Sequence, residues 1–102
     1  MTEKVKCLDV KTWEEFDILN NNKDLRIVNP IIEGILDNLN TKKRWVHVLD
    51  VYIEEEGDTG HITVDRLQFK EVLEENLETY VNYEMYDKCI KIRDTIKELE
   101  NK

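Results

Sequence analysis

Residues 44–64 read RWVHVLDVYIEEEGDTGHITV, and this stretch decides the fold class of the chain. Residues 44–55 are rich in β-branched and aromatic side chains, which favour a strand. Residues 57–60, Gly-Asp-Thr-Gly, are typical of a turn, and residues 61–64 predict a returning strand. We therefore expect a β-hairpin over about 44–64. Because side chains alternate between the two faces of a strand, one face of the first strand should carry Trp45, Leu49, Val51 and Ile53.

A third strand should complete the sheet, because an isolated two-stranded hairpin is only marginally stable in water. The candidates are residues 4–10, where apolar and polar side chains alternate loosely, and the short segment 25–28. We predict a small antiparallel sheet built from the hairpin and one of these segments.

Two helix-start signals precede the hairpin. Thr12 is followed three residues later by Glu15, the spacing of a capping box, so a helix is expected over about 13–20. Asn29-Pro30 is a favourable helix start, with Asn as the cap and Pro at the first helical position. The helix that follows should bury one face, formed by Ile31, Ile32, Ile35, Leu36 and Leu39.

Residues 65–102 predict two amphipathic helices. Asp65 and Gln68 have capping-box spacing ahead of a helix over about 66–82, and a second helix is expected over about 84–99. A short connection between two such helices is typical of an antiparallel hairpin. The second helix carries a narrow apolar seam formed by Met85, Cys89, Ile92, Ile96 and Leu99.

Residues 73–99 resemble the UVR motif, the small helical hairpin of the UvrB and UvrC excision-repair proteins, of the activator of bacterial protein arginine kinase and of some Clp ATPases. The second helix of that motif carries an aromatic residue, two small residues, a Leu-Arg-Asp triplet, an Ile and a Leu. The motif has small residues where its helices approach, whereas this chain has Tyr80-Val81 and Cys89-Ile90. The remaining positions of the motif are matched at the same spacing by Tyr86, Ile92-Arg93-Asp94, Ile96 and Leu99.

The resemblance implies a role in joining proteins, because the UVR motif is not catalytic and pairs with a second copy of itself or with a related surface. It predicts a non-enzymatic adaptor or regulator whose partner is another protein or a second copy of this chain. In a homodimer, two hairpins would form a four-helix bundle. The residues expected at this interface are Val72, Tyr80, Tyr86, Ile90, Arg93 and Asp94.

The charge of the chain argues against direct binding to nucleic acid. The formal net charge is −8 and the isoelectric point is about 4.8, so the surface should repel phosphate backbones. The basic run Lys42-Lys43-Arg44 is short and fits a solvated turn ahead of a strand.

The acidic side chains suggest an alternative function. They could imitate nucleic acid and block a nucleic-acid-binding enzyme, as several small phage inhibitors do. A composition rich in Asn, Lys, Ile and Glu fits a phage or low-GC bacterial source. The acidic side chains in question are Glu54, Glu55, Glu56 and Asp58 at the tip of the β-hairpin, and Glu71, Glu74, Glu75 and Glu78 on the next helix. The first group also fits an ordinary solvated turn, and the second also fits an ordinary solvent-exposed helix face.

Catalytic and metal-binding residues are not expected. His47 and His61 fall on neighbouring strands, and two His with one Asp could hold a metal ion with open positions. The aspartates nearby in sequence are Asp50, Asp58 and Asp65. The predicted strand face places His47 beside Trp45 and Leu49, however, which favours a packed or rim histidine. We therefore predict no metal, no cofactor and no enzymatic activity.

The remaining features predict a single α+β domain over residues 1–102, with an α/β part over 1–64 and the helical hairpin over 65–102. No apolar run resembles a signal peptide or a membrane span. Cys7 and Cys89 do not form a CxxC pair, so free, buried thiols in a reducing compartment are expected. These features predict a cytoplasmic protein that does not bind membranes.

Overall fold

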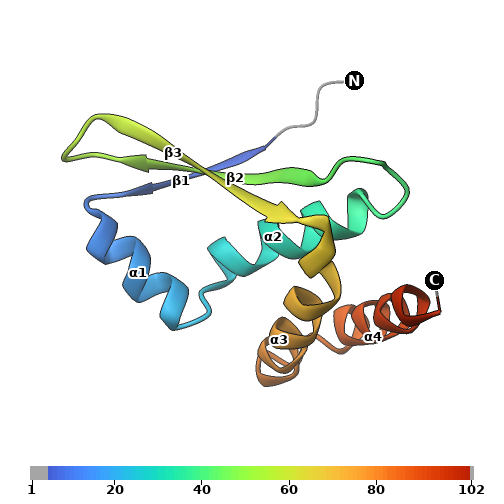
Figure 1. The fold of residues 1–102 in the computed structure, drawn as a ribbon. Helices are drawn as coiled ribbons and strands as arrows, with labels where there is room; N and C mark the ends of the chain where they lie inside the picture. The colour runs from blue at the N-terminus through green and yellow to red at the C-terminus, as the bar shows by residue number, and fades with distance from the viewer. Residues whose placement is uncertain (1–4, 102) are drawn as a thin grey trace. The chain divides into compact units, whose positions relative to one another are not determined.

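The computed structural model describes residues 5–101, which fold as a mixture of helices and a sheet (Figure 1). The chain divides into two compact units, the residues up to Arg66 and those from Leu67 onward. The first unit contains β1 (Lys6–Val10), α1 (Trp13–Asn21), α2 (Leu25–Asp37), β2 (Trp45–Ile53) and β3 (Asp58–Asp65). The second contains α3 (Phe69–Asn82) and α4 (Tyr86–Glu100), and a 3-10 turn, η1 (Arg66–Gln68), lies at the boundary. In the described part of the chain, no helix has the length and apolar character needed to cross a membrane.

The sheet is mixed, with the strand order β1-β2-β3. β2 and β3 form the predicted antiparallel hairpin, but β1 pairs with β2 in parallel, with Lys6 opposite Leu49 and Val10 opposite Ile53. The expectation of a purely antiparallel sheet was therefore wrong. A parallel pair requires a long crossover connection, and residues 11–44 supply it because they contain both α1 and α2. The alternative strand at 25–28 is instead the first turn of α2.

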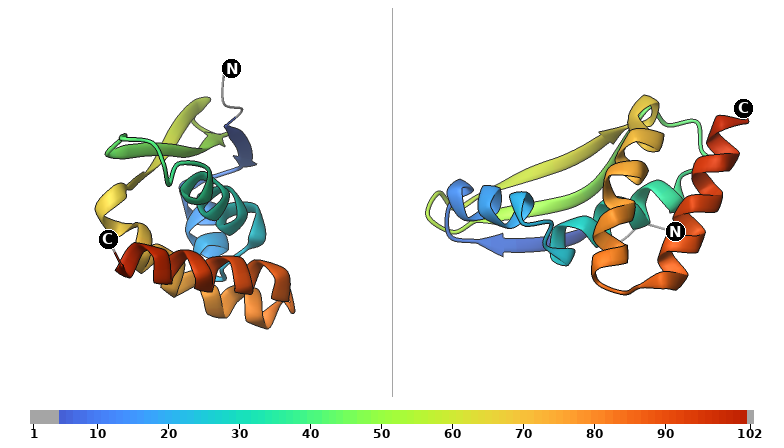
Figure 2. Two further views of the ribbon diagram at one scale, coloured as in Figure 1. Left: turned by 90° about the vertical axis from the view of Figure 1, so that its right-hand side faces the viewer. Right: turned by 90° about the horizontal axis from the view of Figure 1, so that it is seen from below.

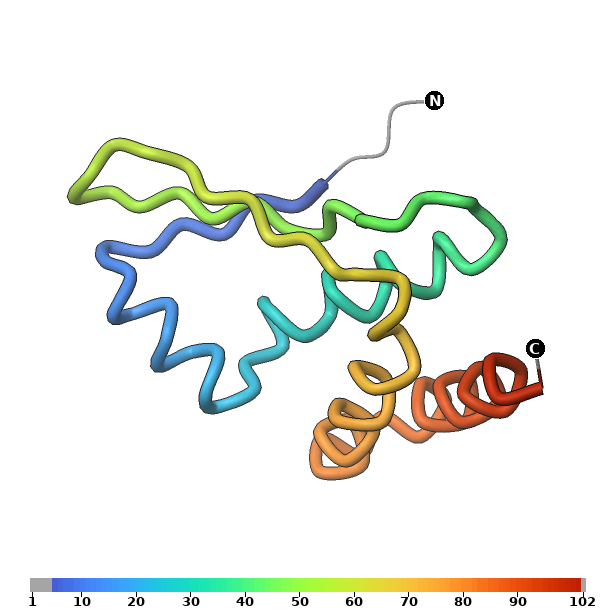
Figure 3. Tube along the Cα trace, viewed as in Figure 1, coloured from blue at the N-terminus to red at the C-terminus, as the bar shows by residue number. Residues whose placement is uncertain are grey.

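Helices α1 and α2 cover one side of the sheet, as Figures 1 and 3 show. The sheet and these helices share the buried core of the first unit. Its members on the strands are Leu8, Val10, Val46, Val48, Leu49, Val51, Ile53 and Val64. Those on the helices are Phe16, Ile27, Val28, Ile32 and Ile35. The other side of the sheet, termed the open side because neither α1 nor α2 covers it, carries exposed side chains that include Cys7, Asp9, His47, Tyr52 and His61.

The start of α1 confirms the predicted cap at Thr12, whereas the return bond to Glu15 comes from the residue before the cap. Thr12 Oγ1 accepts a hydrogen bond from the Glu15 backbone N–H at 3.1 Å. The Glu15 carboxylate in turn accepts one from the Lys11 N–H at 3.1 Å. Local chemistry that is visible in the sequence therefore defines this helix start.

The start of α2 differs from the prediction at Asn29-Pro30. α2 begins at Leu25, because the Asp24 carboxylate accepts a hydrogen bond from the Arg26 N–H at 2.9 Å and caps the helix. The preceding helix ends with Lys23 in the left-handed conformation, with φ 54°, so the two helices follow each other closely. Pro30 consequently lies inside α2, where it removes one N–H from the helical ladder.

The turn of the β-hairpin lies earlier than predicted. Ile53 pairs with Asp58, so residues 54–57 form the turn and residues 58–60 already belong to β3. The Gly57 N–H donates to the Ile53 carbonyl at 2.8 Å, and Gly57 has φ +60°, a conformation that glycine adopts without strain.

In the second unit, α3 and α4 pack against each other and run in opposite directions (Figure 2). The start of this hairpin differs from the prediction, because the 3-10 turn η1 follows Asp65 and α3 begins only at Phe69. Gln68 occupies the N-cap position of α3 without a side-chain cap hydrogen bond, and Asp65 pairs with Arg44 at 3.3 Å.

The connection between α3 and α4 is a left-handed helix end at Glu84, which has φ 58°. The Met85 N–H donates to the Tyr80 carbonyl at 2.9 Å, and the Glu84 N–H donates to the Val81 carbonyl at 3.0 Å. These are the two hydrogen bonds of a Schellman motif, here without the glycine that usually occupies the left-handed position. Sequence patterns based on glycine therefore give no sign of this turn.

Candidate functional site

A β-bulge in β2 decides which side chains reach the open side of the sheet. The register of β2 against β3 shifts between His47 and Leu49, so Val48 is an extra residue in the strand. Both Val48 and Leu49 are buried, and the alternation of faces is reversed beyond them. Trp45 is 60% exposed and His47 is also exposed, so the prediction that they share a face with Leu49 was wrong.

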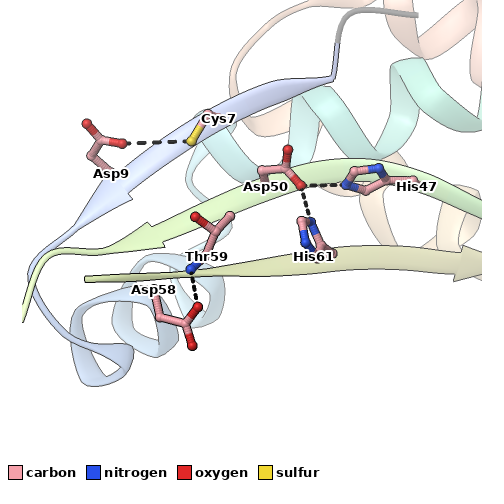
Figure 4. A network of polar contacts seen from close by, with 7 residues as sticks. All are labelled: Cys7, Asp9, His47, Asp50, Asp58, Thr59 and His61. Carbon is pink, nitrogen blue, oxygen red and sulfur yellow. Dashed lines mark hydrogen bonds and ion pairs between the residues drawn. The ribbon is translucent and has the colours of Figure 1, made fainter. Parts of the chain in front are cut away.

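The bulge brings His47 and Asp50 together on the open side, although they are three residues apart. β3 places His61 directly opposite Asp50. His47 Nε2 lies 2.5 Å from Asp50 Oδ1, and His61 Nδ1 lies 2.6 Å from the same oxygen (Figure 4). The imidazole rings stand at 87° to each other with their centroids 5.2 Å apart. These three residues are termed the His–Asp–His cluster.

The imidazoles stabilise the ionised form of the Asp50 carboxyl. The pKa of Asp50 lies below its usual value, chiefly because of the hydrogen bond from His61, and His47 adds to the effect while desolvation opposes it. On the neighbouring strand, Cys7 lies opposite Asp50 and its thiol points to the Asp9 carboxylate, 3.8 Å away. Desolvation and the negative charges of Asp9 and Asp50 raise the pKa of the Cys7 thiol. Cys7 is exposed, so the expectation that it is buried was wrong.

The His–Asp–His cluster is accessible to solvent. The side chains of His47, Asp50 and His61 are 39%, 25% and 64% exposed. His47 also borders an open hollow of about 180 Å³ between α2 and the strands β1 and β2. The two other aspartates considered from the sequence lie elsewhere: Asp58 accepts a hydrogen bond from the adjacent Thr59 N–H, and Asp65 pairs with Arg44.

The interface residues expected from the UVR resemblance differ in exposure. Tyr86 is 58% exposed and Ile90 is 49% exposed, and both lie on α4. Arg93 and Asp94 are exposed on the same helix and form an ion pair at 3.7 Å. Val72 is half-buried. Tyr80 has no exposed surface and lies under the Lys88 ammonium, which is 5.3 Å from its ring centroid. Tyr80 therefore lacks the exposure that was expected of an interface residue.

The acidic residues of the alternative function are all exposed, but they fall in both units. Glu54, Glu55 and Glu56 form the turn between β2 and β3, and Asp58 follows them at the start of β3. The Glu54 and Glu55 N–H groups donate to the Val10 and Lys11 carbonyls, which ties this turn to the end of β1. The other four are Glu71, Glu74, Glu75 and Glu78, all on α3.

Comparisons with protein-family models, with curated proteins and with solved structures find no match to this chain. Its function is therefore inferred from the surfaces described above.

Proposed function

We propose that this protein is a non-enzymatic interaction module, an adaptor or regulator that binds another protein or a second copy of itself through α4. The observation that carries this proposal is the exposure of Tyr86 and Ile90, 58% and 49%, on one face of that helix. Residues four apart are neighbours on a helix surface, and Arg93 and Asp94 continue the same face one turn further on. These four residues are termed the α4 face.

The composition of the α4 face suits a protein interface. Burying large aromatic and aliphatic side chains at an interface contributes favourably to the free energy of binding, by about 25 cal/mol for each Å² of apolar surface removed from water. Tyr and Arg are among the residues that most often dominate binding energy. The Arg93–Asp94 pair would then form a polar rim beside the apolar Tyr86 and Ile90. The UVR resemblance includes Tyr86, Arg93 and Asp94 of this face and supports the same role.

We expect Tyr86→Ser and Ile90→Asp to weaken self-association or partner capture by about tenfold or more, because each removes an apolar anchor. Light scattering or sedimentation of the full chain measures self-association, and pull-down with identification of bound proteins measures partner capture. Lys91→Ala is the matched control, since Lys91 is exposed on the same helix but lies beside the α4 face. A wild type that stays monomeric at high micromolar concentration and captures the same proteins as Ile90→Asp would contradict the proposal.

A second candidate function is inhibition of a nucleic-acid-binding enzyme through the acidic turn. The observation that favours it is the exposure of three consecutive carboxylates, Glu54, Glu55 and Glu56, on a turn held by hydrogen bonds to β1. Such a turn would present concentrated negative charge to a basic site on a partner.

If the acidic turn binds the partner, affinity should fall steeply with added salt, because exposed charges are screened beyond about 8 Å at physiological ionic strength. Reversing Glu54, Glu55 and Glu56 to Lys should slow association more than it speeds dissociation. Surface plasmon resonance at several salt concentrations separates the two rates. An affinity that does not change with salt would favour the α4 face instead.

A further inference from the structure

We propose that His47, Asp50 and His61 bind one divalent transition-metal ion on the open side of the sheet. The inference is independent of the α4 face and concerns the first unit only. One His Nε2, one His Nδ1 and one carboxylate oxygen all lie within 4.8 Å of one another in this cluster. Two imidazoles and one carboxylate are a common protein donor set for zinc and for related borderline metal ions.

The distances in the cluster are close to those that a metal ion requires. Two ligand atoms that each lie about 2.1 Å from a tetrahedral zinc ion are about 3.4 Å apart. Asp50 Oδ1 lies 2.5 Å and 2.6 Å from the two imidazole nitrogens, so each of these distances must open by less than about 1 Å. The two imidazole nitrogens are at most 4.8 Å apart, so this distance needs to shorten by no more than about 1.4 Å. Small side-chain rotations on exposed residues can provide both changes.

The backbone around the cluster is already in place. His61 and Asp50 are paired across two antiparallel strands, and the bulge at Val48 turns His47 to the same side. Bulges occur frequently beside functional sites, where they re-aim a side chain. Because the donors come from a hydrogen-bonded pair of strands rather than from separate loops, metal binding would not require a segment to become ordered.

The chemistry of the donors selects the class of metal. Mg²⁺ and Ca²⁺ prefer oxygen ligands only, whereas two of these three donors are imidazole nitrogens. Affinity should follow the usual order for such sites, in which Zn²⁺ and Ni²⁺ bind less tightly than Cu²⁺. The exposure of His61, 64%, leaves room for water or a further ligand at the remaining coordination positions.

The alternative is that the cluster is only a hydrogen-bonded group of side chains. The two interpretations differ in stoichiometry, in metal preference and in the residues on which binding depends. Isothermal titration of the metal-free, reduced full chain with Zn²⁺ should give one equivalent bound, and Mg²⁺ at millimolar concentration should not displace it. The melting temperature should rise with Zn²⁺, because a ligand that binds the folded state stabilises it.

Three variants test the donors. His47→Gln, Asp50→Asn and His61→Gln should each weaken Zn²⁺ binding by at least about tenfold, since even residues that only orient metal ligands change affinity by that much. Asp9→Asn is the matched control, because Asp9 is an exposed carboxylate on the neighbouring strand that is not part of the cluster. Its Zn²⁺ affinity should equal that of the wild type.

Circular dichroism and melting without metal establish that each variant is folded. If Asp50→Asn does not fold, the two histidine variants still decide the matter, because both side chains are more exposed than that of Asp50. The proposal is overturned if Zn²⁺ does not bind. It is also overturned if Zn²⁺ affinity is unchanged in the two histidine variants. A loss of Zn²⁺ affinity in Asp9→Asn as large as that in the cluster variants would overturn it as well.

Discussion

Ile92→Asp is expected to unfold the second unit, whereas Ile90→Asp on the same helix is expected to leave it folded. Ile92 has 0% exposed surface and Ile90 is 49% exposed, although the two residues are separated by one position on α4. A carboxylate at position 92 would be buried without a partner, which costs roughly 4–5 kcal/mol or more. That amount is comparable with the whole stability of a small domain, about 5–15 kcal/mol.

The measurement is a urea titration of the full chain monitored by NMR, in which the amide signals of α3 and α4 report on the second unit. In Ile92→Asp, these amide signals should already lack the dispersion of a folded protein before any urea is added. In Ile90→Asp, the urea concentration at the midpoint of unfolding should change little from that of the wild type. Ile96→Asp should fall between them, since Ile96 is half-buried. Unfolding by Ile90→Asp would mean that the exposed residues of α4 belong to the core, and the α4 face would then be no interface.

Gly34→Val is expected to destabilise the first unit, because α2 and β2 approach closely at this position. A Cβ atom on Gly34 would overlap the Cγ1 atom of Val48 and lie 3.1 Å from its Cβ atom. Replacing a glycine inside a helix normally stabilises it by up to about 1 kcal/mol. Here overpacking of the core opposes that gain, and we expect a net loss of about 1–3 kcal/mol.

Val48→Ala provides the control for this prediction, because it removes the methyl groups that meet the new side chain. Urea unfolding of the two single variants and of the double variant forms a thermodynamic cycle. The double variant should be more stable than the sum of the single effects predicts. Additive effects, or a Gly34→Val variant as stable as the wild type, would show that the helix and the strand are not in contact at this position.

Local sequence chemistry was enough to predict several elements of this protein. The Thr12 cap of α1, the composition of β2 and the apolar periodicity of α4 are each local features. The helix starts that were placed wrongly show where such reasoning stops. Asn29-Pro30 has the form of a helix start, but the cap at Asp24 lies upstream and the helix runs through the proline. Asp24 and Asn29-Pro30 are both compatible with a helix start. The longer helix that begins after Asp24 is favoured because it buries more apolar side chains on one face of α2.

The direction of β1 could not be predicted from its own residues. The side chains of a five-residue strand do not specify the direction in which it pairs, because that direction depends on the path of the chain between the strands. The crossover through α1 and α2 makes β1 parallel to β2, and this is a property of the tertiary arrangement.

The sequence by itself therefore determined the class of most elements, because composition, caps and periodicity are local, but it left open which of Asp50, Asp58 and Asp65 lies beside the two histidines. Only the tertiary structure decided that His47, Asp50 and His61 converge. Strict alternation along β2 puts His47 on the same face as Leu49, and one extra residue at the bulge reverses that alternation. A bulge forms where both Val48 and Leu49 can be buried against the rest of the core, a condition that depends on residues far away in sequence.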